Sequence, residues 1–98
     1  MSFQVVVDQI NKQAENIEPL GATFKIRIDD SVVFIDGTGD SNQVSMDDKD
    51  ADCTVTTSVD AIEKLRSGAL NPMMAVTSGK IKIKGDMSLA MKLQSLFG

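Results

Sequence analysis

Few side chains in this sequence could do acid–base or nucleophilic chemistry. The chain contains no His, Tyr or Trp, so the commonest general base and metal ligand is missing, and so is the phenolic acid. Cys53 is the single cysteine and cannot form an internal disulfide. It lies within an alternating strand pattern, with no basic neighbour in sequence to lower its pKa. Catalysis would have to rest on carboxylates, Lys, Ser or Cys53. We interpret Cys53 as a small buried core residue and expect no bound cofactor.

The acidic stretch DDKDAD, residues 47–52, suggests a calcium site at first sight. Carboxylates at Asp48, Asp50 and Asp52 imitate the spacing of an EF-hand loop. The loop requires Gly where Cys53 stands and a bidentate Glu where Val59 stands, so the match fails at its strictest positions. We therefore expect a solvated turn between strands and no metal site.

The composition predicts one globular domain over residues 1–98. The chain has 98 residues, of which 42% are apolar and 24% charged, and its net charge is −4. No stretch approaches the roughly 20 apolar residues of a membrane span. Binding to nucleic acid rests on neutralising several phosphates, and this acidic chain is a poor candidate for it. The opening residues, MSFQVVVDQINK, lack the pattern of a secretory signal, so an intracellular protein is expected.

The first half of the chain predicts one helix followed by strands. Residues 2–17 have helical spacing, with Ser2 as the cap, and stop before Pro19. The apolar face of this helix contains Phe3, Val6, Val7, Ile10, Ala14 and Ile17. Four strands are predicted next, at residues 22–30, 31–37, 43–48 and 51–58, with a turn at Asp29 and Asp30 joining the first two. Val32 to Ile35 are all apolar, which suits a strand covered on both faces or bent at its middle.

The second half predicts two short helices, a strand and a final helix. Thr57 and Asp60 match a capping box, and the helix they start ends at Gly68. A second short helix runs from Asn71 and Pro72 to Gly79. Residues 80–85 alternate Lys with Ile and predict a strand, and Asp86 caps the last helix. Its broad apolar face contains Met87, Leu89, Ala90, Met91, Leu93, Leu96 and Phe97. This order indicates an α+β sandwich with helices on one face of the sheet.

Methionine is concentrated at the C-terminal end, at positions 73, 74, 87 and 91. Met is unbranched and adapts to partners of varying shape, so the concentration suggests a surface that repacks. Ordinary core packing explains the same pattern, and periodicity does not separate the two interpretations.

Residues 50–97 resemble the C-terminal half of the sterol carrier protein lipid-binding domain. The matching segments are ADCTVT, SGALNP and GKIKIKGDMSLAMKLQSL, in the same order and at similar spacing. The N-terminal half, with its opening helix and GATFKIRIDD hairpin, follows the family more loosely. The resemblance covers essentially the whole chain.

This resemblance implies a five-stranded, mainly antiparallel sheet with helices on one face and an apolar tunnel closed by the final helix. It implies non-catalytic binding and transfer of fatty acids, fatty acyl-CoA or sterols. The lining residues it implies are Phe24, Ile26, Phe34, Ile62, Leu65, Met73, Met74, Val76, Ile83, Met87, Met91, Leu93 and Leu96. An empty tunnel is costly, so we expect the methionines to collapse inward without ligand, or a fatty acid to occupy the tunnel.

Two departures from the family qualify these expectations. The opening helix carries Asp8, Glu15 and Glu18 against Lys12, which disfavours electrostatic docking on an anionic membrane and leaves transient contact as the expectation. The chain ends in SLFG without an SKL-type tripeptide, so a cytoplasmic location is expected over a peroxisomal one. The alternative function is an accessory or dimerisation module that serves a lipid-metabolising enzyme. A monomer and a homodimer both remain open.

Overall fold

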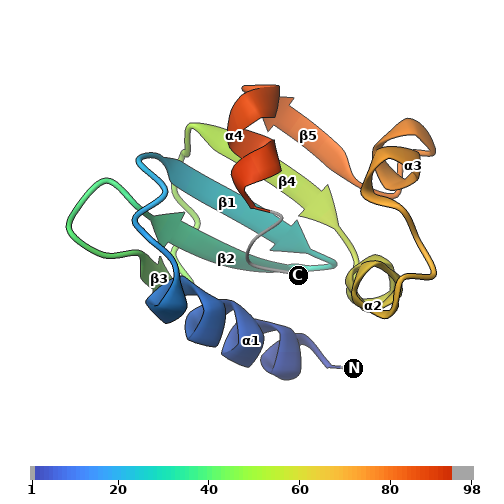
Figure 1. Ribbon diagram of the computed structural model, residues 1–98, viewed down its shortest axis with the longest axis horizontal. Helices are drawn as coiled ribbons and strands as arrows, with labels where there is room; N and C mark the ends of the chain where they lie inside the picture. Colours follow the sequence, from blue (N-terminus) through green and yellow to red (C-terminus); the bar gives the residue numbers. More distant parts are fainter. Residues whose placement is uncertain (1, 94–98) are drawn as a thin grey trace.

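The computed structural model describes residues 2–93, and over them the predicted order of helices and strands is confirmed. Figure 1 shows this arrangement along the chain. The elements are α1 (Phe3–Asn16), β1 (Thr23–Ile28), β2 (Ser31–Asp36), β3 (Gln43–Ser45), β4 (Cys53–Thr57), α2 (Val59–Ser67), α3 (Pro72–Thr77), β5 (Lys82–Gly85) and α4 (Met87–Lys92). No helix among these residues is both long enough and apolar enough to cross a membrane.

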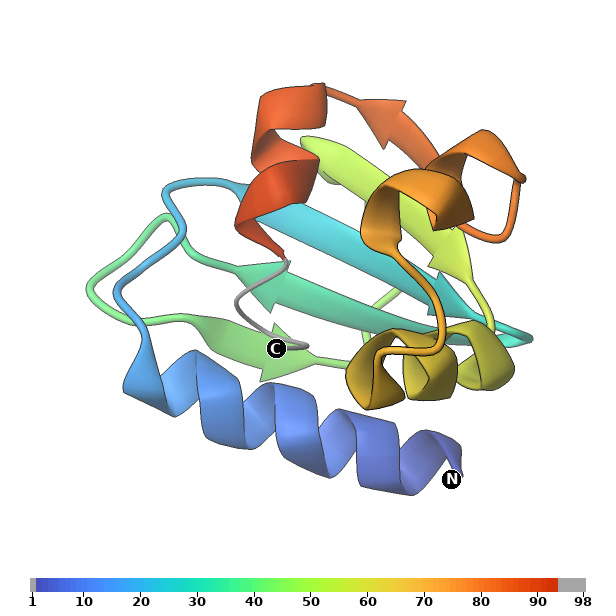
Figure 2. The same ribbon diagram turned by 45° about the vertical axis from the view of Figure 1, so that its right-hand side comes forward.

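The strands form one mixed sheet in the order β3-β2-β1-β4-β5. Strands β1 and β4 are parallel, and the other three neighbouring pairs are antiparallel. The helices lie on one side of this sheet in both views (Figures 1 and 2). The predicted fold class, an α+β structure with a mainly antiparallel five-stranded sheet, is therefore confirmed.

Alternation along β1 separates the two faces of the sheet. Phe24 and Ile26 are fully buried toward the helices, whereas Lys25 and Arg27 point to the outer face. The predicted turn at Asp29 and Asp30 joins β1 to β2, and Asp29 adopts a φ of 55°. Short polar residues tolerate this left-handed conformation better than β-branched ones.

Strand β2 is covered on both faces, as its continuous apolar run allows. Its Val33 and Ile35 are fully buried on the helix side. Phe34 pairs with Lys25 in the register and therefore faces outward, yet it is only 5% exposed. The segment between β3 and β4 crosses the outer face to reach the far side of β1, and Lys49 of this segment lies over the Phe34 ring, with Nζ 5.0 Å from its centroid.

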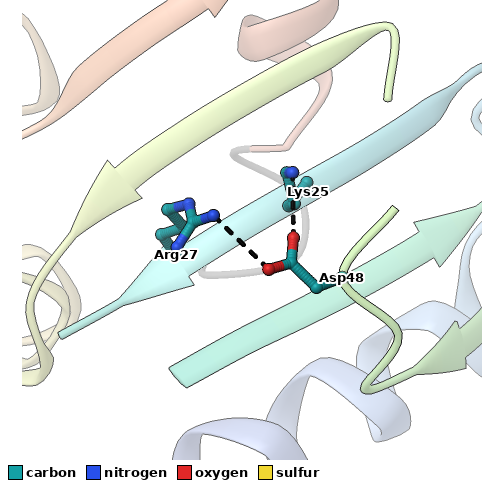
Figure 3. A network of polar contacts seen from close by, with 3 residues as sticks. All are labelled: Lys25, Arg27 and Asp48. Carbon is teal, nitrogen blue, oxygen red and sulfur yellow. Dashed lines mark hydrogen bonds and ion pairs between the residues drawn. The ribbon is translucent and has the colours of Figure 1, made fainter. Parts of the chain in front are cut away.

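The acidic stretch belongs to this crossing segment. Asp48 accepts a hydrogen bond from Lys25 Nζ at 3.0 Å and approaches an Arg27 guanidinium nitrogen at 3.5 Å (Figure 3). The Lys25 hydrogen bond is the main cause that lowers the pKa of the Asp48 carboxyl, and the positive charges of Lys25 and Arg27 add to it. Among the described residues no group of three His, Cys, Asp or Glu could hold a metal ion. The stretch therefore fastens the crossing segment to the sheet.

Helix α2 begins one residue later than predicted. The predicted capping box started at Thr57, but the side chain that caps α2 is Ser58, whose Oγ accepts from the Ala61 N–H at 3.0 Å. Thr57 is still paired with Ile28 in the sheet, so its backbone is extended and cannot start the helix. The other predicted caps, Ser2, Asn71 and Asp86, are confirmed.

Asn42 holds the end of α1 against the β2–β3 connection. Its amide nitrogen donates to the carbonyls of Ala14 and Glu18 at 3.3 and 3.1 Å, and its Oδ1 accepts from the Leu20 N–H at 2.9 Å. These bonds satisfy backbone groups that the end of a helix leaves unpaired. They fix α1 over the β3 side of the sheet, so the β4 and β5 side is left to the later helices.

Candidate functional site

An apolar pocket lies between the inner face of the sheet and the three later helices. Its volume is about 260 Å³. Strands β4 and β5 form its floor, α2 and α3 form one wall, and α4 forms the opposite wall, an arrangement that can be followed in Figure 2. The lining residues are Val55, Thr57, Ile62, Leu65, Pro72, Val76, Ile81, Ile83, Ala90 and Leu93.

The lining offers almost no polar partner to a ligand. Among the described residues that line the pocket, only Thr57 is polar, and its hydroxyl already donates to the Lys80 carbonyl at 3.2 Å. None of the lining side chains within residues 2–93 ionises. A ligand that enters this pocket must therefore place apolar atoms there, because a polar atom would lose its bonds to water without replacement.

Local hydrogen bonds set the positions of α3 and α4 around the pocket. The Ala75 carbonyl accepts from both the Lys80 and Ile81 N–H groups, at 2.9 and 3.1 Å, and so ties α3 to the segment that leads into β5. At the far end, Lys92 Nζ donates to the Leu20 carbonyl at 3.2 Å and anchors α4 to the linker after α1. The two walls are thus held from opposite sides.

Five of the residues predicted to line the cavity lie around this pocket. They are Ile62, Leu65, Val76, Ile83 and Leu93. Five further lining residues were missed, namely Val55, Thr57, Pro72, Ile81 and Ala90. Strand alternation could have found two of them, since Ile81 shares a face with Ile83, and Val55 pairs with the inward Ile26. Helical spacing could have found Ala90, three residues before Leu93.

Three other predicted positions do not reach the pocket. Phe24 and Ile26 are fully buried in the core on the inner face of the sheet. Phe34 lies on the outer face under Lys49, because the β1–β2 register pairs it with Lys25. Predicted Leu96, with Phe97 beside it, lies outside the described residues.

The four C-terminal methionines are on the surface, and the expected inward collapse is not seen. Their exposed fractions are 73% for Met73, 62% for Met74, 50% for Met87 and 63% for Met91. The helices instead turn smaller residues inward: Ala75 is fully buried on α3, and Ala90 faces the pocket on α4. Whether the methionines contact a lipid stays a prediction.

Cys53 is fully buried in the core, as predicted. Burial raises the pKa of its thiol, and the negative charge of Asp86 raises it further. A thiol in this state is a poor nucleophile near neutral pH, because the thiolate is the reactive form. The cysteine is therefore a packing residue.

Comparison with known proteins gives consistent results. Residues 3–98 match the model of the family described as "SCP-2 sterol transfer family". Sterol carrier protein 2 of Rattus norvegicus is 32% identical over 96% of this chain, which corresponds to 19% of that protein, so the chain spans about a fifth of its relative. The solution structure of sterol carrier protein domain 2 of Helicoverpa armigera is 32% identical, with a TM-score of 0.64 over 96% of this chain and 80% of that one.

A more distant structure shares the fold. Sterol carrier protein 2 of Aedes aegypti, solved in complex with palmitate, is 24% identical, with a TM-score of 0.73 over 100% of this chain and 97% of that one. The fold, the sequence of the relatives and the family match over nearly all residues agree. The chain belongs to the SCP-2 sterol transfer family.

Proposed function

We propose that this chain binds the hydrocarbon part of a lipid in the pocket between α2, α3 and α4, without catalysing a reaction on it. The observation that carries the proposal is the chemistry of the lining: of the ten lining residues that the structure describes, nine are apolar and the tenth, Thr57, has its hydroxyl engaged. A fatty acid is the ligand class that fits best, with the acyl chain inside and the carboxylate at the mouth. The palmitate bound by the Aedes aegypti relative supports this choice.

The exposed apolar surface of the pocket gives the protein a reason to bind hydrocarbon. The pocket is partly open to solvent, so its apolar walls face water in the ligand-free protein. Burial of such surface against hydrocarbon is favourable by about 25 cal/mol per Å². Hydrocarbon that enters the pocket recovers contacts that the protein does not make alone. The hydrophobic effect is non-directional, so burial of methylene groups favours acyl chains and sterols alike, with little selectivity.

The lining also argues against catalysis at this place. General acid–base chemistry requires a group that gains or loses a proton within reach of the substrate. In the part of the chain that the structure describes, no residue lining the pocket carries such a group, and Cys53 is buried in the core. We infer a carrier or presenting role, in which α4 covers the bound chain on one side and moves to release it.

Thermal unfolding with two ligands of equal length tests the proposal. Palmitate at about 100 times its dissociation constant should add about 2.7 kcal/mol to the free energy of unfolding. For a domain of this size that raises the melting temperature by about 10 °C or more. Hexadecanedioic acid should give little shift, because one of its two carboxylates would have to enter the apolar pocket. Equal shifts with both acids, or none with either, would contradict the proposal.

A second candidate rests on the exposed methionines. Met73 and Met74 on α3 and Met87 and Met91 on α4 leave apolar surface in water. Flexible methionine surfaces suit partners of variable shape, so an accessory or dimerisation module remains the alternative function. Sedimentation equilibrium of the wild type and of the Met73→Gln/Met74→Gln variant separates the lipid-binding function from this alternative. Only an interaction module should associate less when the two methionines are replaced.

A further inference from the structure

A second concave region lies on the outer face of the sheet, away from the lipid pocket. Its volume is about 550 Å³, and charged and hydroxyl side chains of three adjacent strands form most of it. We call it the outer groove and define it by Lys25, Arg27, Thr54, Thr56, Lys82 and Lys84. The proposed lipid function does not use these residues.

The strand register arranges the outer groove as two parallel rows. Arg27 of β1 pairs with Thr56 of β4, which pairs with Lys82 of β5. The second row lies two residues away along each strand and consists of Lys25, Thr54 and Lys84, which pair in the same way. Neighbouring strands lie about 4.8 Å apart, so the Cα atoms of the two basic residues in a row lie about 10 Å apart, with a threonine between them. Basic side chains are long enough to span that width.

The charges of the outer groove are unequally neutralised. On the β1 side, Asp48 pairs with Lys25 and Arg27 at 3.0 and 3.5 Å (Figure 3). On the β5 side, neither lysine has an ion pair or side-chain hydrogen bond to another residue within 2–93. The positive charge that remains to be matched therefore lies along β5.

Carboxylates confine the unmatched charge to one end of the outer groove. Asp50 and Asp52 also line it, and Asp52 precedes Cys53, the partner of Gly85 in the register. They therefore lie beside the row of Lys84. The Asp52 carboxylate already accepts from the Thr23 N–H at 3.0 Å. The row of Arg27, Thr56 and Lys82 is two residues farther along the strands from these carboxylates.

We propose that the row Arg27–Thr56–Lys82 binds a phosphate-bearing anion. Arg27 supplies several N–H donors, of which Asp48 engages one side, and its side chain is 45% exposed. Lys82 supplies an ammonium group, and Thr56 a hydroxyl donor between the two. A phosphate has three or four acceptor oxygens that accept from all three donors at once, and charge-assisted bonds of this kind are among the strong ones. The phosphate can belong to a soluble ligand or to a lipid headgroup, and the test separates these sources.

Titration with inorganic pyrophosphate, followed by amide NMR shifts, tests the site. We expect saturable shifts centred on residues 27, 56 and 82. The variant Arg27→Gln/Lys82→Gln should bind about tenfold more weakly or worse, because it removes two charge-assisted contacts. The matched control, Lys12→Gln/Arg66→Gln, removes the same charge from α1 and α2 on the other side of the sheet and should bind as the wild type does.

Two further arms complete the experiment. The single variant Lys82→Gln breaks no ion pair among the described residues, so it reports on binding with the fold intact. Cosedimentation with phosphatidylcholine vesicles, with and without phosphatidylglycerol, identifies the source of the phosphate. If the protein binds the anionic vesicles and Lys82→Gln weakens this binding, the ligand is a lipid headgroup. If the protein binds pyrophosphate but not the vesicles, the ligand is a soluble phosphate. Absence of saturable binding to either probe, or an equal loss in the matched control, overturns the proposal.

Discussion

Substitution of Ala90 by leucine is the most direct test of whether the pocket is empty space. Ala90 lines the pocket from α4, so a longer side chain at this position points into the cavity. Alanine and leucine are both strong helix formers, and the exchange therefore changes the conformational preference of α4 little. Any large effect must come from what the added carbons meet.

The expected effects on stability and on lipid binding have opposite signs. The exchange adds three carbons, and at about 0.8 kcal/mol per buried CH₂ the ligand-free protein gains up to about 2.4 kcal/mol. That corresponds to a rise in melting temperature of about 10 °C. The same atoms displace ligand from the pocket, so palmitate should lose up to about 2.4 kcal/mol of affinity, or roughly 50-fold.

Two other alanines provide matched controls for Ala90→Leu. Ala75 on α3 is fully buried and does not line the pocket, so Ala75→Leu should overpack the core and cost about 1–3 kcal/mol. Ala69 is exposed after α2, so Ala69→Leu should change stability by less than about 0.5 kcal/mol. Thermal and urea unfolding of the three variants, each with and without palmitate, measures both the change in unfolding free energy and the stabilisation by palmitate.

Two outcomes would refute the reasoning about the pocket. If Ala90→Leu destabilises the ligand-free protein as much as Ala75→Leu does, the space beside α4 is already filled in solution. An unchanged affinity for palmitate in Ala90→Leu would show instead that the acyl chain binds elsewhere. Either result removes the pocket as the basis of the proposed function.

Two further predictions concern Gly85 and Asp86, at the junction of β5 and α4. Gly85→Ala should destabilise the fold by more than about 1 kcal/mol, because Gly85 has a φ of 119° and an added Cβ would lie 2.6 Å from the Asp52 carbonyl oxygen. Gly39→Ala is the control, since a Cβ at Gly39 would meet no atom within 4 Å and should not destabilise the fold in this way. Urea unfolding of the two variants measures the difference. The Ser88 hydroxyl and N–H donate hydrogen bonds to the Asp86 carboxylate, and these bonds lower its pKa below 3.8. The stabilisation that the ionised carboxylate gives to the fold is complete above pH 3.8 and is lost as the pH falls through the lower pKa of the folded state. Asp86→Asn keeps a capping side chain but should flatten the fall in unfolding free energy below about pH 4; an unchanged slope would contradict the assignment.

Much of the fold was predictable because its signals are local. Alternation in β1 separates Phe24 and Ile26 from Lys25 and Arg27, and the structure confirms this division. Capping residues such as Asn71 and Asp86 mark helix starts through a bond to a backbone N–H two residues on. Such features require no knowledge of distant contacts.

The positions of the site residues depended on distant contacts. Phe34 was predicted to line the cavity from the resemblance to the sterol carrier family, and only the pairing with Lys25 shows that it faces outward. The methionines were predicted to collapse inward because an empty tunnel is costly. The short helices α3 and α4 bury Ala75 and Leu93 and leave Met73 and Met91 in water, a choice that tertiary packing makes and periodicity does not.

Strand β5 connects the pocket to the outer groove, because its side chains alternate between the two. Ile83 faces the pocket, while Lys82 and Lys84 face the outer groove. A slip of one residue in the β4–β5 register would turn lysines into the apolar pocket and an isoleucine into the outer groove, and both sites would be lost together. Gly85 opposes this slip, since its φ of 119° and its close approach to the Asp52 carbonyl leave no room for a side chain at this position. The register that Gly85 secures therefore determines both where hydrocarbon can enter and where positive charge gathers.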